Sequence, residues 1–400
     1  MLLEPVDPNE EFRDRRRRAR QRRARRRIAV LTVFALSAAV VALGASFLNG
    51  RGQQATTQAE ASDDAGGTAA PTTTAPPKPE PVPLPSEIRG VHVTMALASL
   101  DGKLDEYFAL TSSGMNTLQL DVKDENGEVG FQRGVGLAKR IGAALRYYDP
   151  LEAARDAETK GVYLIGRVVV FEDPKLSAAK PGMAIRRPDG GVWTTSSGLG
   201  WTNPYDKRVW KYNVDVAVAA GKAGFDEIMF DYVRFPTDGD LASAVFKGRR
   251  PEHKSVTIAS FLKYAKDRLE PLGVRVSAAV FGLSATREMG IGQRPRRLAR
   301  HLDAIYPMVY PSHYGAGEYN LDDPNAVPGI TVGRSLSDFR KSLRGLDTEL
   351  VPWLQDFSLG RDYTLADVQA QILAARDAES RGFLLWNPSG VYTREALAGS

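Results

Sequence analysis

From residue 88 onward, the chain alternates short apolar runs with longer amphipathic stretches. Eight apolar runs have the length of buried strands: 88–94, 116–122, 162–171, 225–235, 274–281, 304–310, 349–357 and 382–387. Between them, seven stretches carry apolar residues at helical spacing: 101–113, 149–160, 207–223, 255–271, 294–302, 335–345 and 364–381. This alternation predicts an α/β fold of the (β/α)8 TIM-barrel type over residues 88–400.

A doubly wound open sheet is the alternative arrangement of the same elements. Such a fold places a glycine-rich phosphate loop directly after its first strand. Here residues 91–94 pass directly into Met95 and Ala96. The chain therefore shows neither a dinucleotide-binding fingerprint nor a P-loop, and the barrel is favoured.

The N-terminal region has the pattern of a signal anchor. Residues 28–48 form a run of 21 residues without a charge, and a helix of that length spans roughly 31 Å, the thickness of a bilayer core. Eleven arginines lie in residues 13–27 and none lies directly after the run. This asymmetry predicts a single-pass protein of the cell membrane, with a cytoplasmic Arg-rich tail (1–27), a transmembrane helix (28–48) and an extracytoplasmic catalytic domain. A cleaved signal peptide, which would release a secreted protein, is the alternative.

Residues 49–87 connect this anchor to the barrel. They contain seven prolines, many Thr and Ala residues and no aromatic residue. A segment of that composition cannot bury a core, so we expect a disordered Pro/Thr/Ala-rich linker.

Charge and cysteine content exclude several classes of function. The net charge is +5, of which residues 1–27 contribute +6, so the rest of the chain is close to neutral. A nucleic-acid footprint on the barrel is therefore not expected. The absence of cysteine excludes disulfides and thiolate chemistry, and without metal-ligand motifs we predict neither a metal nor a cofactor. The sequence leaves the oligomeric state unknown.

The segment 225–236 reads as a buried strand that ends in two ionisable side chains, Asp231 and Arg234. Charged groups at the end of an apolar strand are costly to desolvate, so either an ion pair or chemistry must justify them. In a TIM barrel the carboxyl ends of the strands carry the active site. Asp231 is therefore the leading candidate for a catalytic carboxylate, and a structural pair with Arg234 is the alternative.

Polar and aromatic residues recur at the other strand ends. Aromatic faces cover the apolar patches of a sugar, and amides and acids bind its hydroxyl groups. We therefore predict an oligosaccharide or polysaccharide substrate, bound by Asp121, Lys123, Arg167, Glu172, Arg234, Tyr310, His313, Trp353, Gln355, Trp386 and Asn387.

Glycoside hydrolysis uses two carboxyl groups, one as proton donor and one as nucleophile or base. Asp231 has four candidate partners, of which Asp356 is favoured because strands four and seven face each other across a small barrel. Asp124 is second, followed by Glu172 and Asp173.

Each of these residues also has a structural interpretation. Asp356 could cap the following helix or pair with Arg361. Asp124 lies in the segment KDENG and could simply close a turn, without a catalytic role. Arg167, inside an apolar strand, could keep Asp121 or Asp231 ionised while also binding substrate.

Several blocks of the sequence resemble one known family. They are LDVKD (120–124), GRVVVFEDP (166–174), FDEIMFDYVRFPTDG (225–239), FLKYAKDRLEPLGVRVSAAVFGL (261–283), IYPMVYPSHYG (305–315), PWLQDF (352–357) and LLWNPSGVYT (384–393). In this order they resemble the bacterial family DUF4015, from about Arg89 to about Ala396. The resemblance implies a TIM barrel and a place among carbohydrate-active enzymes, without naming a sugar.

The sequence therefore predicts a membrane-anchored glycoside hydrolase acting on an envelope or extracellular polysaccharide. A carbohydrate-binding or envelope scaffold protein on the same barrel, without turnover, is the alternative. A barrel hydrolase of esters or amides is disfavoured, because no Gly-x-Ser-x-Gly motif occurs.

Overall fold

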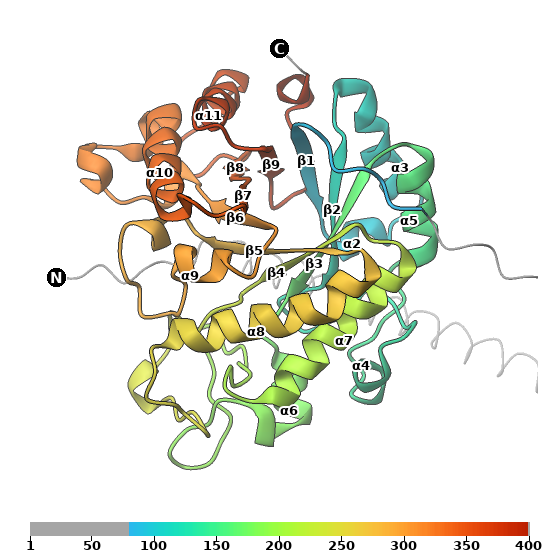
Figure 1. Ribbon diagram of the computed structural model, residues 1–400, viewed down its shortest axis with the longest axis vertical. Coiled ribbons are helices and arrows are strands. Elements are labelled where there is room, and N and C mark those ends of the chain that lie inside the picture. The colour runs from blue at the N-terminus through green and yellow to red at the C-terminus, as the bar shows by residue number, and fades with distance from the viewer. Residues whose placement is uncertain (1–79, 399–400) are drawn as a thin grey trace, which may run out of the picture. The chain divides into compact units, whose positions relative to one another are not determined.

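The computed structural model describes residues 80–398 (Figure 1). Its strands all belong to one parallel sheet: β1 (Ile88–Val93), β2 (Thr117–Lys123), β3 (Tyr163–Val169), β4 (Glu227–Asp231), β5 (Arg275–Phe281), β6 (Ala304–Met308), β7 (Glu349–Leu350), β8 (Trp353–Gln355) and β9 (Gly382–Trp386). The order is β5-β4-β3-β2-β1-β9-β8-β6-β7, and pairing of β5 with β6 closes the sheet into a barrel.

Strands β7 and β8 share one position in this barrel. Both pair with β6, through Ala304 with Glu349 and through Met308 with Trp353. Pro352 lies between the two strands and has no N–H to donate, so the ladder is interrupted there. The predicted strand 349–357 is thus a broken seventh strand, and the barrel has the predicted eight positions.

Helices cover the outside of the barrel. They are α2 (Met95–Ala98), α3 (Lys103–Phe108), α4 (Gly136–Arg140), α5 (Pro150–Thr159), α6 (Pro174–Ala179), α7 (Lys207–Ala223), α8 (Lys254–Leu269), α9 (Pro295–Ala299), α10 (Pro328–Leu343) and α11 (Leu365–Asp377). Figure 1 shows α7 and α8 on one side of the barrel and α10 and α11 on another. The seven predicted helices are present, whereas the short α2, α4 and α6 were not predicted.

Helix α10 begins at Pro328 and not at residue 335 as predicted. Proline suits the first turn of a helix because its missing N–H would be unpaired there anyway. Gly329 and the β-branched Ile330 weaken the helical pattern of that turn, which hides the true start.

Helix α7 directly precedes strand β4, which carries Asp231 at its end. The Asp206 side chain caps its start by accepting from the Arg208 N–H at 2.9 Å. Gly224 ends it in the left-handed region, at φ 113°. Since glycine adopts that conformation without steric cost, the chain can turn back and enter the barrel within a few residues.

Alternate strand residues fill the barrel interior in layers. In the layer near the amino ends of the strands, Glu227 is fully buried. It accepts hydrogen bonds from Tyr163 at 3.0 Å and from Ser277 at 2.5 Å. Burial raises the pKa of the Glu227 carboxyl. Every second residue along β4 faces inward, so Asp231 lies in the layer at the opposite, carboxyl end.

Residues 80–87 pack against the barrel, although the sequence assigns them to the linker. The Val82 N–H donates to Asp226 at 2.9 Å, and Arg376 pairs with Glu87 at 2.7 Å. Asn116 and Arg381 bind backbone carbonyls of the same segment. The part of the chain that contacts the barrel therefore begins before residue 88.

Within residues 80–398, no helix is both long enough and apolar enough to span a bilayer. The predicted arginine-rich tail, the predicted membrane anchor at 28–48 and most of the predicted linker lie outside the described residues.

Candidate active site

Arg167 is the centre of a buried ionic cluster at the carboxyl end of the barrel. Its Nη2 lies 2.7 Å from Asp231 Oδ2, and its Nη1 lies 2.8 Å from Asp121 Oδ1. A third acid, Glu125, lies 3.7 Å from the same Nη1. All four side chains are at least nine-tenths buried. The prediction that Arg167 balances a buried acid is confirmed. Arg167 pairs with both of the acids predicted for it, Asp121 and Asp231.

Asp231 is fixed at the end of β4 from two directions. Arg167 binds its Oδ2, and the N–H of Tyr232 donates to its Oδ1 at 2.7 Å. Tyr232 has a φ of 49°, a left-handed conformation that costs a non-glycine residue about 1–2 kcal/mol. The backbone is therefore strained at the residue whose N–H binds Asp231.

Asp121 links this cluster to strand β1. Its Oδ1 lies 3.6 Å from His92 Nε2, and His92 Nδ1 is 2.9 Å from Gln119 Oε1. Because Asp121 and Asp231 bind one planar guanidinium, their nearest oxygens lie within roughly 8 Å of each other. Glycoside hydrolases separate their two carboxyl groups by about 5–9.5 Å, so a second acid lies no farther from Asp231 than such a pair requires.

Aromatic rings form one wall beside the cluster. Tyr310 stacks on Trp386 with ring centroids 5.2 Å apart and an interplanar angle of 22°. Phe357 packs edge-on against both rings, and His313 lies edge-on to Tyr310 at 5.5 Å. Burial and the nearby Asp231 charge raise the pKa of the Tyr310 phenol. Three of these four ring side chains, Tyr310, His313 and Trp386, belong to the predicted sugar-binding set.

Asp356 follows β8 and is held by the loop after β9. Thr393 donates to both of its oxygens, from its N–H and from its hydroxyl, each at 2.7 Å. Burial raises the pKa of the Asp356 carboxyl against these hydrogen bonds. Asn387 donates to the backbone carbonyl of Asp356. Arg361, the alternative partner of Asp356, pairs instead with Asp367 at 2.6 Å.

Asp124 closes the turn that follows β2. Its two oxygens accept from the Asn126 N–H and side-chain amide and from the Glu128 N–H, at 2.7–3.0 Å. Burial, followed by the neighbouring Glu125 and Glu128 charges, raises the pKa of Asp124 to about 7. The same turn brings Glu125 to Arg167, so the turn interpretation of Asp124 is correct. A proton-donor role stays open because of the raised pKa.

Four residues of the predicted substrate-binding set have structural contacts within the protein: Lys123, Gln355, Arg234 and Glu172. Lys123 is fully buried, lies 2.8 Å from Asp173 and donates to the Val169 carbonyl. Gln355 accepts from the Ser312 N–H and hydroxyl and so holds the loop after β6.

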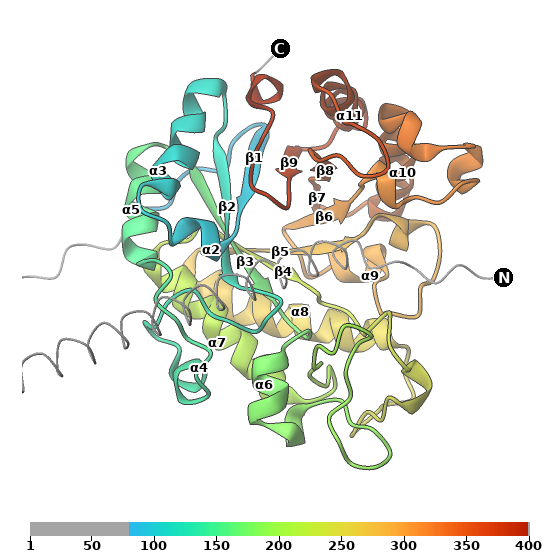
Figure 2. The same cartoon turned by 180° about the vertical axis from the view of Figure 1, so that it is seen from behind.

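Arg234 and Glu172 lie beside the loops that follow β3 and β4. The Arg234 guanidinium donates to Phe235 and lies 4.8–5.1 Å from three aromatic rings, among them Trp201. Buried Glu172 pairs through its backbone with Trp201. The two loops are joined by a bridge between Arg186 and Val245, and Figure 2 shows them side by side.

Reasoning from sequence missed three residues of this region: Glu125, Tyr232 and Thr393. Glu125 lies next to Asp124 in the segment KDENG, and the conformation of the turn decides which of the two side chains points toward Arg167. Tyr232 contributes its backbone, for which its side chain gives no signal. Thr393 lies in the block LLWNPSGVYT, which the family resemblance includes, but its side chain alone does not identify it as the partner of Asp356.

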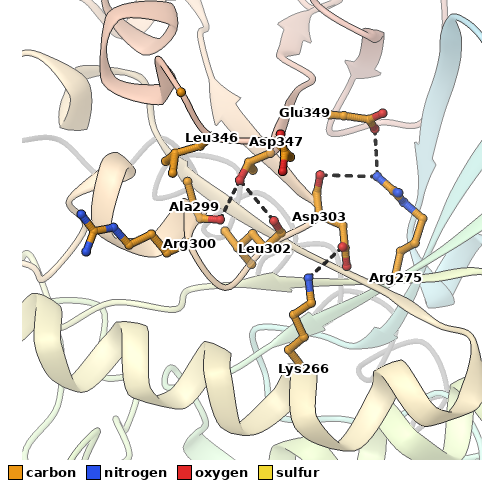
Figure 3. A pocket seen from close by; sticks show the side chains of 11 residues that line it. Lys266, Arg275, Ala299, Arg300, Leu302, Asp303, Leu346, Asp347 and Glu349 are labelled. Atoms are coloured by element: carbon orange, nitrogen blue, oxygen red, sulfur yellow. Dashed lines mark hydrogen bonds and ion pairs between the residues drawn. The ribbon is translucent and has the colours of Figure 1, made fainter.

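A second polar region lies at the opposite end of the barrel. A pocket of about 360 Å³ lies at the amino ends of β5, β6 and β7 (Figure 3). Four of its charged side chains form two ion pairs, Lys266 with Asp303 at 2.9 Å and Arg275 with Glu349 at 2.8 Å. Charged groups at this face of a TIM barrel usually serve stability. The catalytic candidates all lie at the other face.

Comparison with known families agrees with this geometry. The family model DUF4015, described as "Putative glycosyl hydrolase domain", matches residues 90–392. The chain belongs to this family. Membership places it among the glycosyl hydrolases, as the sequence blocks predict. No curated protein matches the chain significantly.

Three solved structures illustrate what the chain is similar to. A hypothetical protein from Ruminiclostridium thermocellum ATCC 27405 shares 34% identity, over 47% of this chain and 96% of that chain, with a TM-score of 0.43. The PgaB (BpsB) glycoside hydrolase domain from Bordetella bronchiseptica shares 14%, over 78% and 99%, with a TM-score of 0.58. The endo-1,4-beta-D-mannanase from Thermotoga petrophila RKU-1 shares 12%, over 75% and 88%, with a TM-score of 0.52. The last two support the barrel fold.

Proposed function

We propose that this DUF4015 protein is an exported, membrane-tethered glycoside hydrolase that cleaves an envelope or extracellular polysaccharide. The observation that carries the catalytic part is the Asp231 carboxylate, held by Arg167 among buried acids and aromatic rings at the carboxyl end of the barrel. The tether rests on the uncharged run at 28–48 and the arginines before it.

The two carboxyl groups of the reaction would be Asp231 and Asp356. The raised pKa of Asp356 favours its protonated form, which a proton donor needs. Asp356 would give its proton to the glycosidic oxygen as the bond to the anomeric carbon breaks. Asp231, paired with Arg167, would attack that carbon or remove a proton from the attacking water. In either case the product sugar gains one hydroxyl from water, and the proton returns to the acid pair.

Asp124 is the second candidate for the donor. Its pKa of about 7 lies in the range where a general acid works at neutral pH. Its oxygens accept three hydrogen bonds within its own turn, which favours a role in ordering that turn. Asp356, whose carboxyl accepts two hydrogen bonds from Thr393, is therefore the stronger candidate.

Digestion of a panel of envelope and plant polysaccharides tests this proposal, with reducing ends as the readout. The wild type should release sugar from at least one member. Asp356→Asn should reduce the rate on the order of 10²- to 10⁴-fold, whereas Asp124→Asn should reduce it much less. Binding without turnover by the wild type would contradict the proposal and favour the carbohydrate-binding scaffold.

A further inference from the structure

Three buried polar atoms at the carboxyl end of the barrel have no hydrogen-bond partner within residues 80–398. They are Asp121 Oδ2, Trp353 Nε1 and the Tyr310 hydroxyl. Their residues are only 1%, 2% and 1% exposed. Buried polar groups are nearly always paired, because an unpaired one loses its hydration without compensation. Three together therefore call for an explanation.

These atoms come from three separate strands and gather around one guanidinium. Asp121, on β2, binds Arg167 through its other oxygen. Trp353, on β8, places its ring 6.0 Å from the Arg167 guanidinium carbon. Tyr310, just after β6, lies near enough to Asp231 for that carboxylate to affect its titration. Among residues 80–398 eleven such atoms occur, and the residues of these three all have Arg167 as a neighbour.

Neighbouring tyrosines show that partners are available at this end of the barrel. The Tyr392 hydroxyl donates to the carbonyl of His92, and the Tyr148 hydroxyl donates to the carbonyl of Asp121 at 3.0 Å. Tyr107 likewise donates to Gly390 at 2.7 Å. The unpaired Tyr310 hydroxyl is therefore a local exception that a bound ligand would resolve.

We propose that Asp121, Trp353 and Tyr310 recognise the hydroxyl groups of the pyranose ring that lies beside Asp231. This assignment rests on the proposed function. Asp121 Oδ2 can only accept when ionised, Trp353 Nε1 can only donate, and the Tyr310 hydroxyl can do either. A hydroxyl group both donates and accepts, so a ring carrying several hydroxyls satisfies all three atoms.

The charges around Arg167 further limit the ring. Asp231, Asp121 and Glu125 place three carboxyl groups around a single guanidinium. A carboxylate on the sugar would add like charge to this buried cluster, where repulsion is poorly screened. The ring bound here is therefore a pyranose without a carboxylate, and not a uronic acid.

Calorimetric titration with neutral β-1,4-linked gluco-, manno- and N-acetylglucosamine oligosaccharides tests the assignment, with oligogalacturonides as the anionic comparison. The wild type should bind at least one neutral series and bind oligogalacturonides at least tenfold more weakly. Tyr310→Phe and Trp353→Phe should each weaken that binding roughly 5- to 100-fold. Tight binding of oligogalacturonides, binding of none of the neutral series, or unchanged affinity in both variants would overturn the assignment.

Thermal unfolding separates recognition from a structural role. Tyr310→Phe should keep or raise the Tm, because the hydroxyl it removes has no partner in the described part of the chain. The matched variant Tyr107→Phe, which loses a formed hydrogen bond, should lower the Tm by roughly 1–5 °C. An equal fall in both variants would contradict the proposal. If the wild type binds a neutral series but never hydrolyses it, the proposed hydrolase function fails while the recognition set stands.

Discussion

Replacement of Arg167 by methionine should strongly destabilise the folded protein at neutral pH. Arg167 is 5% exposed and binds two carboxylates that are 1% and 2% exposed. Removal of one partner of a buried ion pair leaves an uncompensated charge, which costs about 3–5 kcal/mol. Arg167→Met leaves two such charges, so the free energy of unfolding should fall by at least that amount.

The loss should depend on pH in a defined direction. Without Arg167, Asp121 and Asp231 would be buried without their cation, and taking up a proton would remove the unpaired charge. The folded variant would then bind protons more tightly than the unfolded chain. Its penalty should therefore be largest at pH 7.5 and shrink as the pH falls to 5.

Urea unfolding of wild type and Arg167→Met at both pH values measures this effect. Arg187→Met is the matched control, because Arg187 and Asp189 form an ion pair whose side chains are 52% and 63% exposed. Exposed pairs contribute about 0–1 kcal/mol. A loss below about 1 kcal/mol for Arg167→Met at pH 7.5, or an equal loss at both pH values, would refute the ionic cluster as described.

Three further results are expected. In the wild type, the folded state binds the Asp124 proton (pKa about 7) more tightly than the unfolded chain does, so this group lowers the Tm as the pH rises from about 4 to about 7. Asp124→Asn should flatten that fall; equal slopes in both proteins would contradict this. A chain that begins at Ile88 should melt at a lower temperature than one that begins at Glu80, since residues 80–87 contact the barrel; equal melting temperatures would restore the predicted boundary. Lys123→Met should cost about 3–5 kcal/mol of stability in urea unfolding and leave the KM for the cleaved polysaccharide unchanged; a stable variant with a raised KM would make Lys123 a substrate ligand.

The barrel could be predicted because its periodicities are strong. Each strand lies within a short, mostly apolar run, and α7 keeps a clear apolar stripe, so that its observed bounds coincide with the predicted ones. Because active sites of TIM barrels lie at the carboxyl ends of the strands, Asp231 and Arg167 could be predicted to lie in the same region. The weak points were turns and helix starts, such as Pro328, where glycine and β-branched residues mask the pattern.

The side-chain directions at β2 could not be predicted in the same way. A regular strand would place Asp121 and Lys123 on the same face, because the side-chain period is two. The pairing of β2 with β3 shifts register between these residues. Asp121 therefore faces Arg167 inside the barrel, whereas Lys123 lies against Asp173 and the Tyr212 ring. A register shift of this kind depends on the neighbouring strand and leaves no mark in the local sequence.

Loss of turnover in Asp231→Asn tests the central claim most directly. Asparagine has nearly the same shape but cannot act as a nucleophile or base. On the polysaccharide that the wild type cleaves best, Asp231→Asn should reduce kcat on the order of 10²- to 10⁴-fold, while a cooperative unfolding transition shows that it is folded. A folded Asp231→Asn protein that releases reducing sugar at the wild-type rate would contradict the account.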